Sequence, residues 1–181
     1  MSPLATVAEV VEFWREAGPT AWFARNADFD ATFRQRFLET HMAAARRELD
    51  RWMADATGAL ALMVLLDQFP RNAFRGTAHM FATDALALAL ARRALAAGHD
   101  GEVDAALRLF FYLPFEHSED IEDQRIAVAR CAPLGDPFDR YAQIHFEVIA
   151  RFGRFPHRNA ALGRDTTPEE QAFLDAGGFA G

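Results

Sequence analysis

Lysine is absent from this chain: all 19 basic residues among its 181 residues are arginine. Mechanisms that need a lysine amine, such as Schiff-base formation, are therefore excluded, and every strong cation stays charged at any relevant pH. Cysteine is almost absent as well. The one thiol, Cys131, excludes an internal disulfide and a cysteine-rich metal site. We expect it to be a free structural thiol.

Long apolar runs and signature loops are also missing. The longest apolar stretches, at 59–66 and 85–91, are far shorter than the ~20 residues of a membrane-spanning helix. The first residues carry no basic stretch and meet acids at Glu9 and Glu12, so we expect no signal peptide and a cytoplasmic location. The net charge of −7 argues against nucleic-acid binding. Without a glycine-rich phosphate loop, a nucleophile elbow, a dinucleotide fingerprint or an HExxH motif, we expect neither a metal nor another cofactor.

The rest of the sequence carries many signals of helix starts and ends. Thr6 followed by Glu9 fits a capping box, and Gly18–Pro19 is expected to close that first helix. Asp30 is the expected cap of a second helix, and Leu60–Phe69 is apolar nearly all round, as in a buried helix.

The second half of the chain carries the same kind of punctuation. We expect Thr77 to open a helix that runs to Gly98, and Gly153 to follow the last turn of another. Thr167-Pro168 combines a capping box with a proline start, and Gly177 closes that helix. Alternating β-branched runs are absent. The sequence therefore predicts a single all-α domain, residues 1–181, with about seven to eight helices.

Two short boxes echo each other. QFPRN occupies residues 68–72 and RFPHRN residues 154–159, and each is followed by a further arginine beside a glycine, Arg75 or Arg164. Proline is expected to end the preceding helix, and asparagine tolerates turn conformations. The arginines would then stand on preset turns. A third box at 113–124 is rich in acids and contains Glu116 and His117.

These boxes resemble a bacterial family of unknown function, domain-of-unknown-function family 924. The similarity rests on LDQFPRN, on LPFEHSED followed by DQ, and on FGRFPHRN followed by LGR and TPEE, and it covers essentially the whole chain. The sequence departs from the family pattern at two places: residues 42–52 look altered, and the C-terminus ends early, at Gly181. The resemblance implies a TPR-like right-handed superhelix and no established activity.

Our first hypothesis is that the boxes form a polar pocket for an anionic small molecule. Arginine binds phosphate or carboxylate through forked hydrogen bonds, histidine exchanges protons near neutral pH, and Asp67 or Glu116 would orient a histidine. The candidate catalytic residues are His117 and His157. The candidate ligand-binding residues are Asp67, Arg71, Asn72, Arg75, Glu116, Arg154, Arg158 and Asn159.

Other interpretations remain open. The arginines of the boxes can pair with the chain's own acids as an internal network, which fixes geometry more reliably than it adds stability. His145 faces an apolar stripe, as a core histidine would, and His41, His79 and His99 are expected on helix surfaces or in turns. The alternative function is a helical module that binds an acidic peptide or a protein partner. Whether the chain forms a homodimer is a further open alternative.

Overall fold

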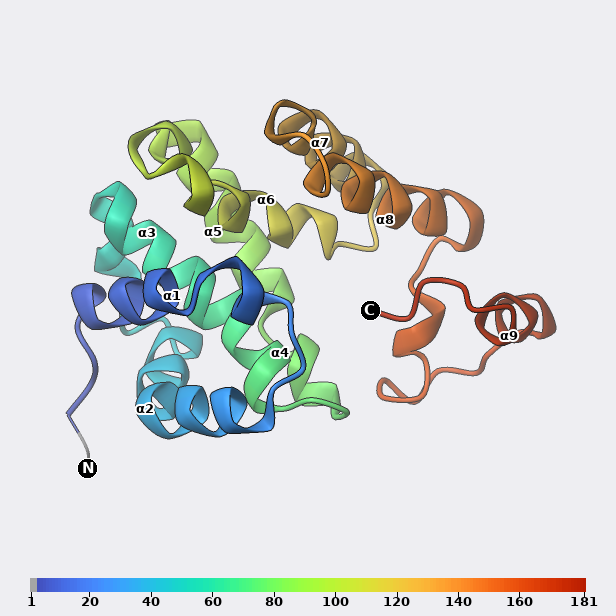
Figure 1. The fold of residues 1–181 in the computed structure, drawn as a ribbon, viewed down its shortest axis with the longest axis horizontal. Coiled ribbons are helices and arrows are strands. Elements are labelled where there is room, and N and C mark those ends of the chain that lie inside the picture. The colour runs from blue at the N-terminus through green and yellow to red at the C-terminus, as the bar shows by residue number, and fades with distance from the viewer. Residues whose placement is uncertain (1–2) are drawn as a thin grey trace. The chain divides into compact units, whose positions relative to one another are not determined.

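The computed structural model describes residues 3–181, and this part of the chain is helical with no strand (Figure 1). The all-α prediction is confirmed. The chain divides into two compact units, Met1–Pro114 and Phe115–Gly181. The α-helices are α1 (Val7–Trp22), α2 (Ala27–Ala45), α3 (Ala56–Met63), α4 (Phe69–Ala73), α5 (Asp84–Ala97), α6 (Leu109–Glu116), α7 (Ile121–Cys131), α8 (Phe138–Phe152) and α9 (Pro168–Asp175).

The first helix, α1, begins as expected. The Thr6 hydroxyl accepts a hydrogen bond from the Glu9 amide while the Glu9 carboxylate accepts one from the Thr6 amide, a complete capping box. The predicted break at Gly18–Pro19 is confirmed, because Gly18 leaves the helical conformation, although a second helical segment follows directly and completes α1. Gly18 takes φ +69°, which glycine adopts without steric cost, and the helix restarts at Pro19 and reaches Trp22.

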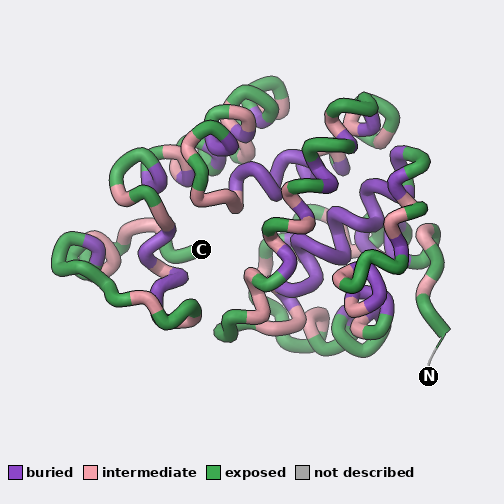
Figure 2. Tube along the Cα trace, turned by 180° about the vertical axis from the view of Figure 1, so that it is seen from behind, coloured by how far each residue is buried: buried purple, intermediate pink, exposed green. Residues whose placement is uncertain are grey.

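The core of the first unit is a rod built from α3, a π-helical turn (Val64–Gln68) and α4. Every residue from Gly58 to Pro70 is buried, as Figure 2 shows, which confirms the expectation for Leu60–Phe69. Proline does not end this helix, contrary to the prediction. Pro70 lacks an N–H, and in the π-helical turn before it two carbonyls meet side-chain donors: Nδ1 of His41 lies 2.8 Å from the Leu65 oxygen, and the Thr83 hydroxyl lies 2.5 Å from the Leu66 oxygen.

Two expected helix starts lie elsewhere. α2 begins at Ala27, and its cap is Asn26 rather than Asp30. The side-chain oxygen of Asn26 accepts hydrogen bonds from the backbone amides of Asp28 and Phe29. Asp30 is used by other side chains, described below. Thr77 opens only a short 3₁₀ turn (Ala78–Phe81), and the helix that reaches Gly98, α5, begins at Asp84.

In the second unit, α7 and α8 pack against each other, and α9 follows a long turn. Gly153 ends α8 in the left-handed conformation, and Thr167 and Glu170 complete the predicted capping box of α9. Val148, Ile149 and Phe155 form the core, with Phe152 and other aromatic side chains packed around it. The predictions of a single domain and of a TPR-like superhelix concern the whole chain, and both stay predictions.

No helix within residues 3–181 combines the length and the apolar character that crossing a membrane requires.

Candidate functional site

The predicted site residues fall in both units. Asp67, Arg71, Asn72 and Arg75 belong to the first unit, and Glu116, His117, Arg154, His157, Arg158 and Asn159 belong to the second. Each unit therefore holds one arginine–asparagine box.

In the first unit, Arg71 is tied to carboxylates. Its guanidinium forks onto Asp84, with Nη1–Oδ1 at 2.8 Å and Nη2–Oδ2 at 3.0 Å, and Nη1 lies 3.3 Å from Oδ1 of Asp67. Asp67 is 1% exposed and also accepts a hydrogen bond from the Gln68 amide. The π-helical turn brings these two residues into the interior, because both lie at its C-terminal end.

One acid serves the rest of this box. Asp30 accepts hydrogen bonds from Nδ2 of Asn72 at 2.8 Å and from Nε of Arg75 at 2.6 Å. Asp30 therefore holds the turn that carries Arg75 against α2.

The second unit repeats this arrangement with different acids. Arg154 forks onto Glu170 at 2.6 and 2.8 Å, and Asn159 donates to the same carboxylate at 3.2 Å. The hydrogen bonds from Arg154, together with those of Thr167, lower the pKa of Glu170 to about 2. Glu170 is therefore ionised at neutral pH.

Arg164 forms a second fork, onto Glu119, at 2.7 and 3.0 Å. Glu119 also accepts a hydrogen bond from the Phe155 amide at 2.8 Å. Burial raises the pKa of Glu119, but the hydrogen bonds from Arg164 and Phe155 outweigh it, and the pKa is lowered. Four arginines of the boxes (Arg71, Arg75, Arg154 and Arg164) are therefore bound to the chain's own carboxylates, as the internal-network interpretation holds.

In the second unit His145 and His157 lie beside Phe155, and His117 lies beside His145; we call the three histidines the histidine cluster. The ring centroids of His117 and His145 are 6.2 Å apart, and those of His145 and His157 each lie 5.6 Å from that of Phe155. The turn at Pro156–Arg158 positions His157, and α8 positions His145. The local chain geometry thus gathers the two predicted catalytic histidines and a third.

His145 is paired with Glu116. Its Nδ1 lies 3.0 Å from Oε1 of Glu116 and 2.8 Å from the backbone oxygen of Tyr141. Nδ1–H donates to the Tyr141 oxygen, so Nε2 carries the lone pair, and none of the described residues bonds to it. The sequence suggested that Asp67 or Glu116 orients one of His117, His145 and His157, and in the structure Glu116 lies beside His145.

The other oxygen of Glu116, Oε2, lies 4.0 Å from Sγ of Cys131. Burial raises the pKa of the Cys131 thiol far above its ordinary value, and the negative charge of Glu116 adds to this shift. The thiol is therefore a weak donor to the carboxylate and no nucleophile.

The buried rings of the cluster are neutral. Burial lowers the pKa of His145 to about 3, with the charge of His117 as the next cause, and burial lowers the pKa of His157 to about 4, with the charge of Arg158 next. Nδ1 of His157 is buried and, among residues 3–181, has no hydrogen-bond partner.

Arg158 supplies the nearest fixed positive charge. It is 6% exposed, and its guanidinium lies 4.4 Å from the centroid of the Phe155 ring. Arg158 contributes to the lowered pKa of both His145 and His157. The cluster therefore combines a positive charge with neutral imidazoles whose affinity for protons is low.

Sequence reasoning missed three features. His41 is completely buried rather than on a surface, and burial lowers its pKa. Phe179 covers the histidine cluster, as described below. The pairing of Glu116 with His145 joins distant parts of the second unit, and the only signal for it was an isolated polar residue on an apolar helix face.

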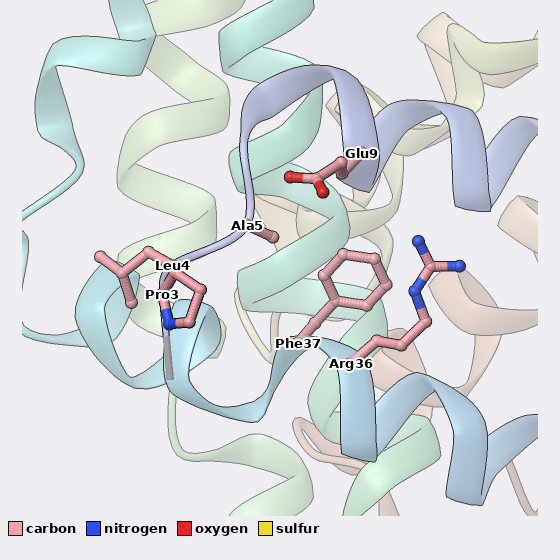
Figure 3. Close-up of a pocket in the computed structure, with 6 residues that line it drawn as sticks. All are labelled: Pro3, Leu4, Ala5, Glu9, Arg36 and Phe37. Carbon is pink, nitrogen blue, oxygen red and sulfur yellow. The ribbon is translucent and has the colours of Figure 1, made fainter. Parts of the chain in front are cut away.

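A pocket elsewhere in the first unit has a volume of about 150 Å³ and lies between the N-terminal residues and α2 (Figure 3). Pro3, Leu4, Ala5, Glu9, Arg36 and Phe37 line it. The carboxylate of Glu9 is already used in the capping box, and none of the predicted site residues lies there. In the part of the chain that the structure describes, no group of three or more histidine, cysteine, aspartate or glutamate side chains could hold a metal ion.

Comparison with known proteins confirms the family resemblance. Residues 10–178 match the family described as "Bacterial protein of unknown function (DUF924)". A solved structure of a protein of unknown function from Agrobacterium tumefaciens is 54% identical and superposes with a TM-score of 0.92, covering 94% of this chain and 97% of the other. No curated protein matches. The chain therefore belongs to DUF924, a family of bacterial proteins of unknown function.

Proposed function

We propose that this protein binds an anionic small molecule at the histidine cluster and that the Glu116–His145 pair acts as a general base on it. One observation carries the proposal: Oε1 of Glu116 lies 3.0 Å from Nδ1 of His145, while Nε2 has no protein partner among the described residues. A carboxylate that holds one ring nitrogen protonated leaves the other as a proton acceptor and stabilises the imidazolium that forms.

The chemistry follows from the same geometry. A hydroxyl or amine of the ligand gives its proton to Nε2 of His145, and the new positive charge is balanced by Glu116. Arg158 attracts the anionic group, because it is the fixed cation nearest to the neutral rings. His117 and His157 keep the acid–base roles that the sequence assigns to them.

Anion binding also adjusts the base. The pKa of His145 is low partly because His117 and Arg158 repel a further positive charge. A bound anion offsets those charges and raises the pKa of His145 toward the range in which it works as a base. Binding should therefore take up protons and become tighter as the pH falls toward 5.

A thermal-shift screen of phosphates and carboxylates at millimolar concentration tests the proposal. A ligand present at 100 times its dissociation constant adds about 2.7 kcal/mol to stability, which raises Tm by roughly 5–10 °C for a chain of this size. The shift should be lost in His145→Gln and kept in His79→Gln. His79 stacks on Phe74 in the first unit, outside the histidine cluster, and so provides the control.

Two results would count against the proposal. One is a screen in which no phosphate or carboxylate raises Tm. The other is a ligand whose shift is the same in wild type and His145→Gln, which would put the binding elsewhere.

The alternative, an interaction module for an acidic peptide or protein, draws on a different observation. Arg71, Arg75 and Arg154 already pair with internal acids, so the boxes serve the fold in that case. A partner that still binds His145→Gln and His157→Gln with unchanged affinity would favour this alternative. In either case the buried, unpaired thiol of Cys131 supports the predicted cytoplasmic location.

A further inference from the structure

The segment Gly177–Gly181 folds back over the histidine cluster. At the end of α9 the Gly178 amide bonds to the Phe173 carbonyl at 3.0 Å and the Gly177 amide to the Leu174 carbonyl at 3.0 Å, the pattern of a Schellman motif. Gly177 takes φ +77°, and a Cβ on Gly178 would lie 2.5 Å from the Phe173 ring. Both glycines are therefore needed for the reversal.

The reversal sets the Phe179 ring on two imidazoles. The centroid of Phe179 lies 4.3 Å from that of His145 and 5.3 Å from that of His157, where the rings meet edge to face. Beyond Phe179, Gly181 lies next to Nε2 of His157, and Figure 1 shows the end labelled C beside the turn that carries this histidine. Phe179 thus covers the group that the proposed function uses as its base.

This cover is held weakly. After Gly178, residues 179–181 form no hydrogen bond with any other described residue, and Phe179 is only partly buried. The transfer of one aromatic ring out of water is then the main force that keeps it closed. It favours the closed form by roughly ten- to a hundredfold, so local opening needs no unfolding of α9.

We propose that Phe179 is a movable cover, hinged at Gly177–Gly178, that opens to admit the ligand to His145 and His157. The inference rests on the proposed function for the identity of what enters, but the opening itself can be measured without a ligand. In the closed form Phe179 keeps water from the two rings. In the open form the rings meet solvent, Glu116, Arg158 and His117, with Glu119 and Arg164 also near His157.

Carbethoxylation of histidine by diethyl pyrocarbonate, followed residue by residue by mass spectrometry at pH 6.5, measures the opening. Only neutral, accessible imidazole reacts, and His145 and His157 are neutral at this pH. In Phe179→Ala we expect both histidines to react at least tenfold faster than in wild type. His79, in the first unit, should react at an unchanged rate.

Phe152→Ala is the matched control. Phe152 belongs to the same apolar core and contacts the Phe173 ring at a tilt, but no ring contact joins it to the described histidines. It should lower global stability without speeding the reaction of His145, because local opening does not depend on global unfolding.

Two outcomes overturn the proposal: equal rates in wild type and Phe179→Ala, or an acceleration in Phe152→Ala as large as in Phe179→Ala. The second would mean that the rings become accessible through global unfolding. If Phe179→Ala fails to fold by circular dichroism, Phe179→Leu replaces it, with an expected increase of about threefold and the same two overturning results. None of these rates depends on whether an anion binds, so failure of the cover and failure of the proposed function are distinguishable.

Discussion

At the residue scale, arginine is the only strong cation of this chain, and several arginines bind one carboxylate through two nitrogens. Arg71, Arg154 and Arg164 each place two nitrogens on one carboxylate within 3.0 Å. Lysine cannot form such a fork, since its ammonium is a single point charge. The residue choice therefore gives each box a fixed geometry as well as a neutralised charge.

Adjacent glutamates on α9 separate a structural ion pair from a surface one. Glu170 is buried and bonds Arg154, Asn159 and the Thr167 amide, whereas Glu169 is exposed beside the exposed Arg151. We expect Glu170→Gln to lower the free energy of unfolding by about 1–3 kcal/mol, because it weakens several charge-assisted hydrogen bonds at once. Glu169→Gln should change it by less than about 0.5 kcal/mol.

Urea unfolding at pH 7 measures both variants. Equal small effects would show that the Arg154–Glu170 pair is dispensable to the fold, and Arg154 would return as a candidate ligand residue. The sequence identified Arg154 and Asn159 as a unit, but it could not tell which acid they meet, because Glu170 was predicted only as part of a helix cap.

At the scale of elements, the π-helical turn explains how a proline sits inside a buried rod. The Leu65 and Leu66 carbonyls of this turn accept bonds from His41 and Thr83, which lie in α2 and directly before α5. The local pattern predicted a helix end at this proline. Instead the helix continues, because side chains from two other elements bond its carbonyls. Neither side chain is close to Pro70 in the sequence, so the local pattern could not indicate them.

Thr83→Val tests this explanation. The substitution keeps the shape and removes the donor to the Leu66 carbonyl, so we expect a loss of about 1–3 kcal/mol for an unpaired buried carbonyl. Thr77→Val, which removes an exposed hydroxyl bonded to the Phe74 carbonyl, is the control and should cost much less.

A double-mutant cycle sharpens the result. In a Pro70→Ala background the new amide can reach the free carbonyl, so Thr83→Val should cost about 1 kcal/mol less there than in wild type. Additive effects, measured by denaturant unfolding, would show that Thr83 does not compensate for the proline.

For the whole molecule, the buried histidines link stability to pH. The folded-state pKa values of His145 and His157, about 3 and about 4, lie below the ordinary value of 6.5, and that of His41 is lowered too. Between the lowered pKa values of the folded state and the ordinary value of 6.5, the unfolded chain binds more protons than the folded one. The free energy of unfolding should therefore be highest above pH 6.5 and fall as the pH drops, by about 1–3 kcal/mol per pH unit.

Urea titrations between pH 5 and 7.5 measure this slope. The double variant His145→Gln/His157→Gln should lose most of it, and His79→Gln should keep it. A double variant with the wild-type slope would assign the acid sensitivity to other groups. In the folded protein Glu119 and Glu170, whose pKa values are lowered, stay ionised over this range.

The sequence by itself determined the all-α class, both capping boxes, the buried stretch at 60–69 and the glycines that end α8 and α9. These features depend on contacts between residues a few positions apart, so the local pattern contains the whole interaction. The tertiary structure alone decided which acid each arginine meets, that Pro70 continues a helix, that Glu116 holds His145, and that Phe179 covers it. Those outcomes depend on side chains brought together from distant positions, where no spacing rule identifies the partner.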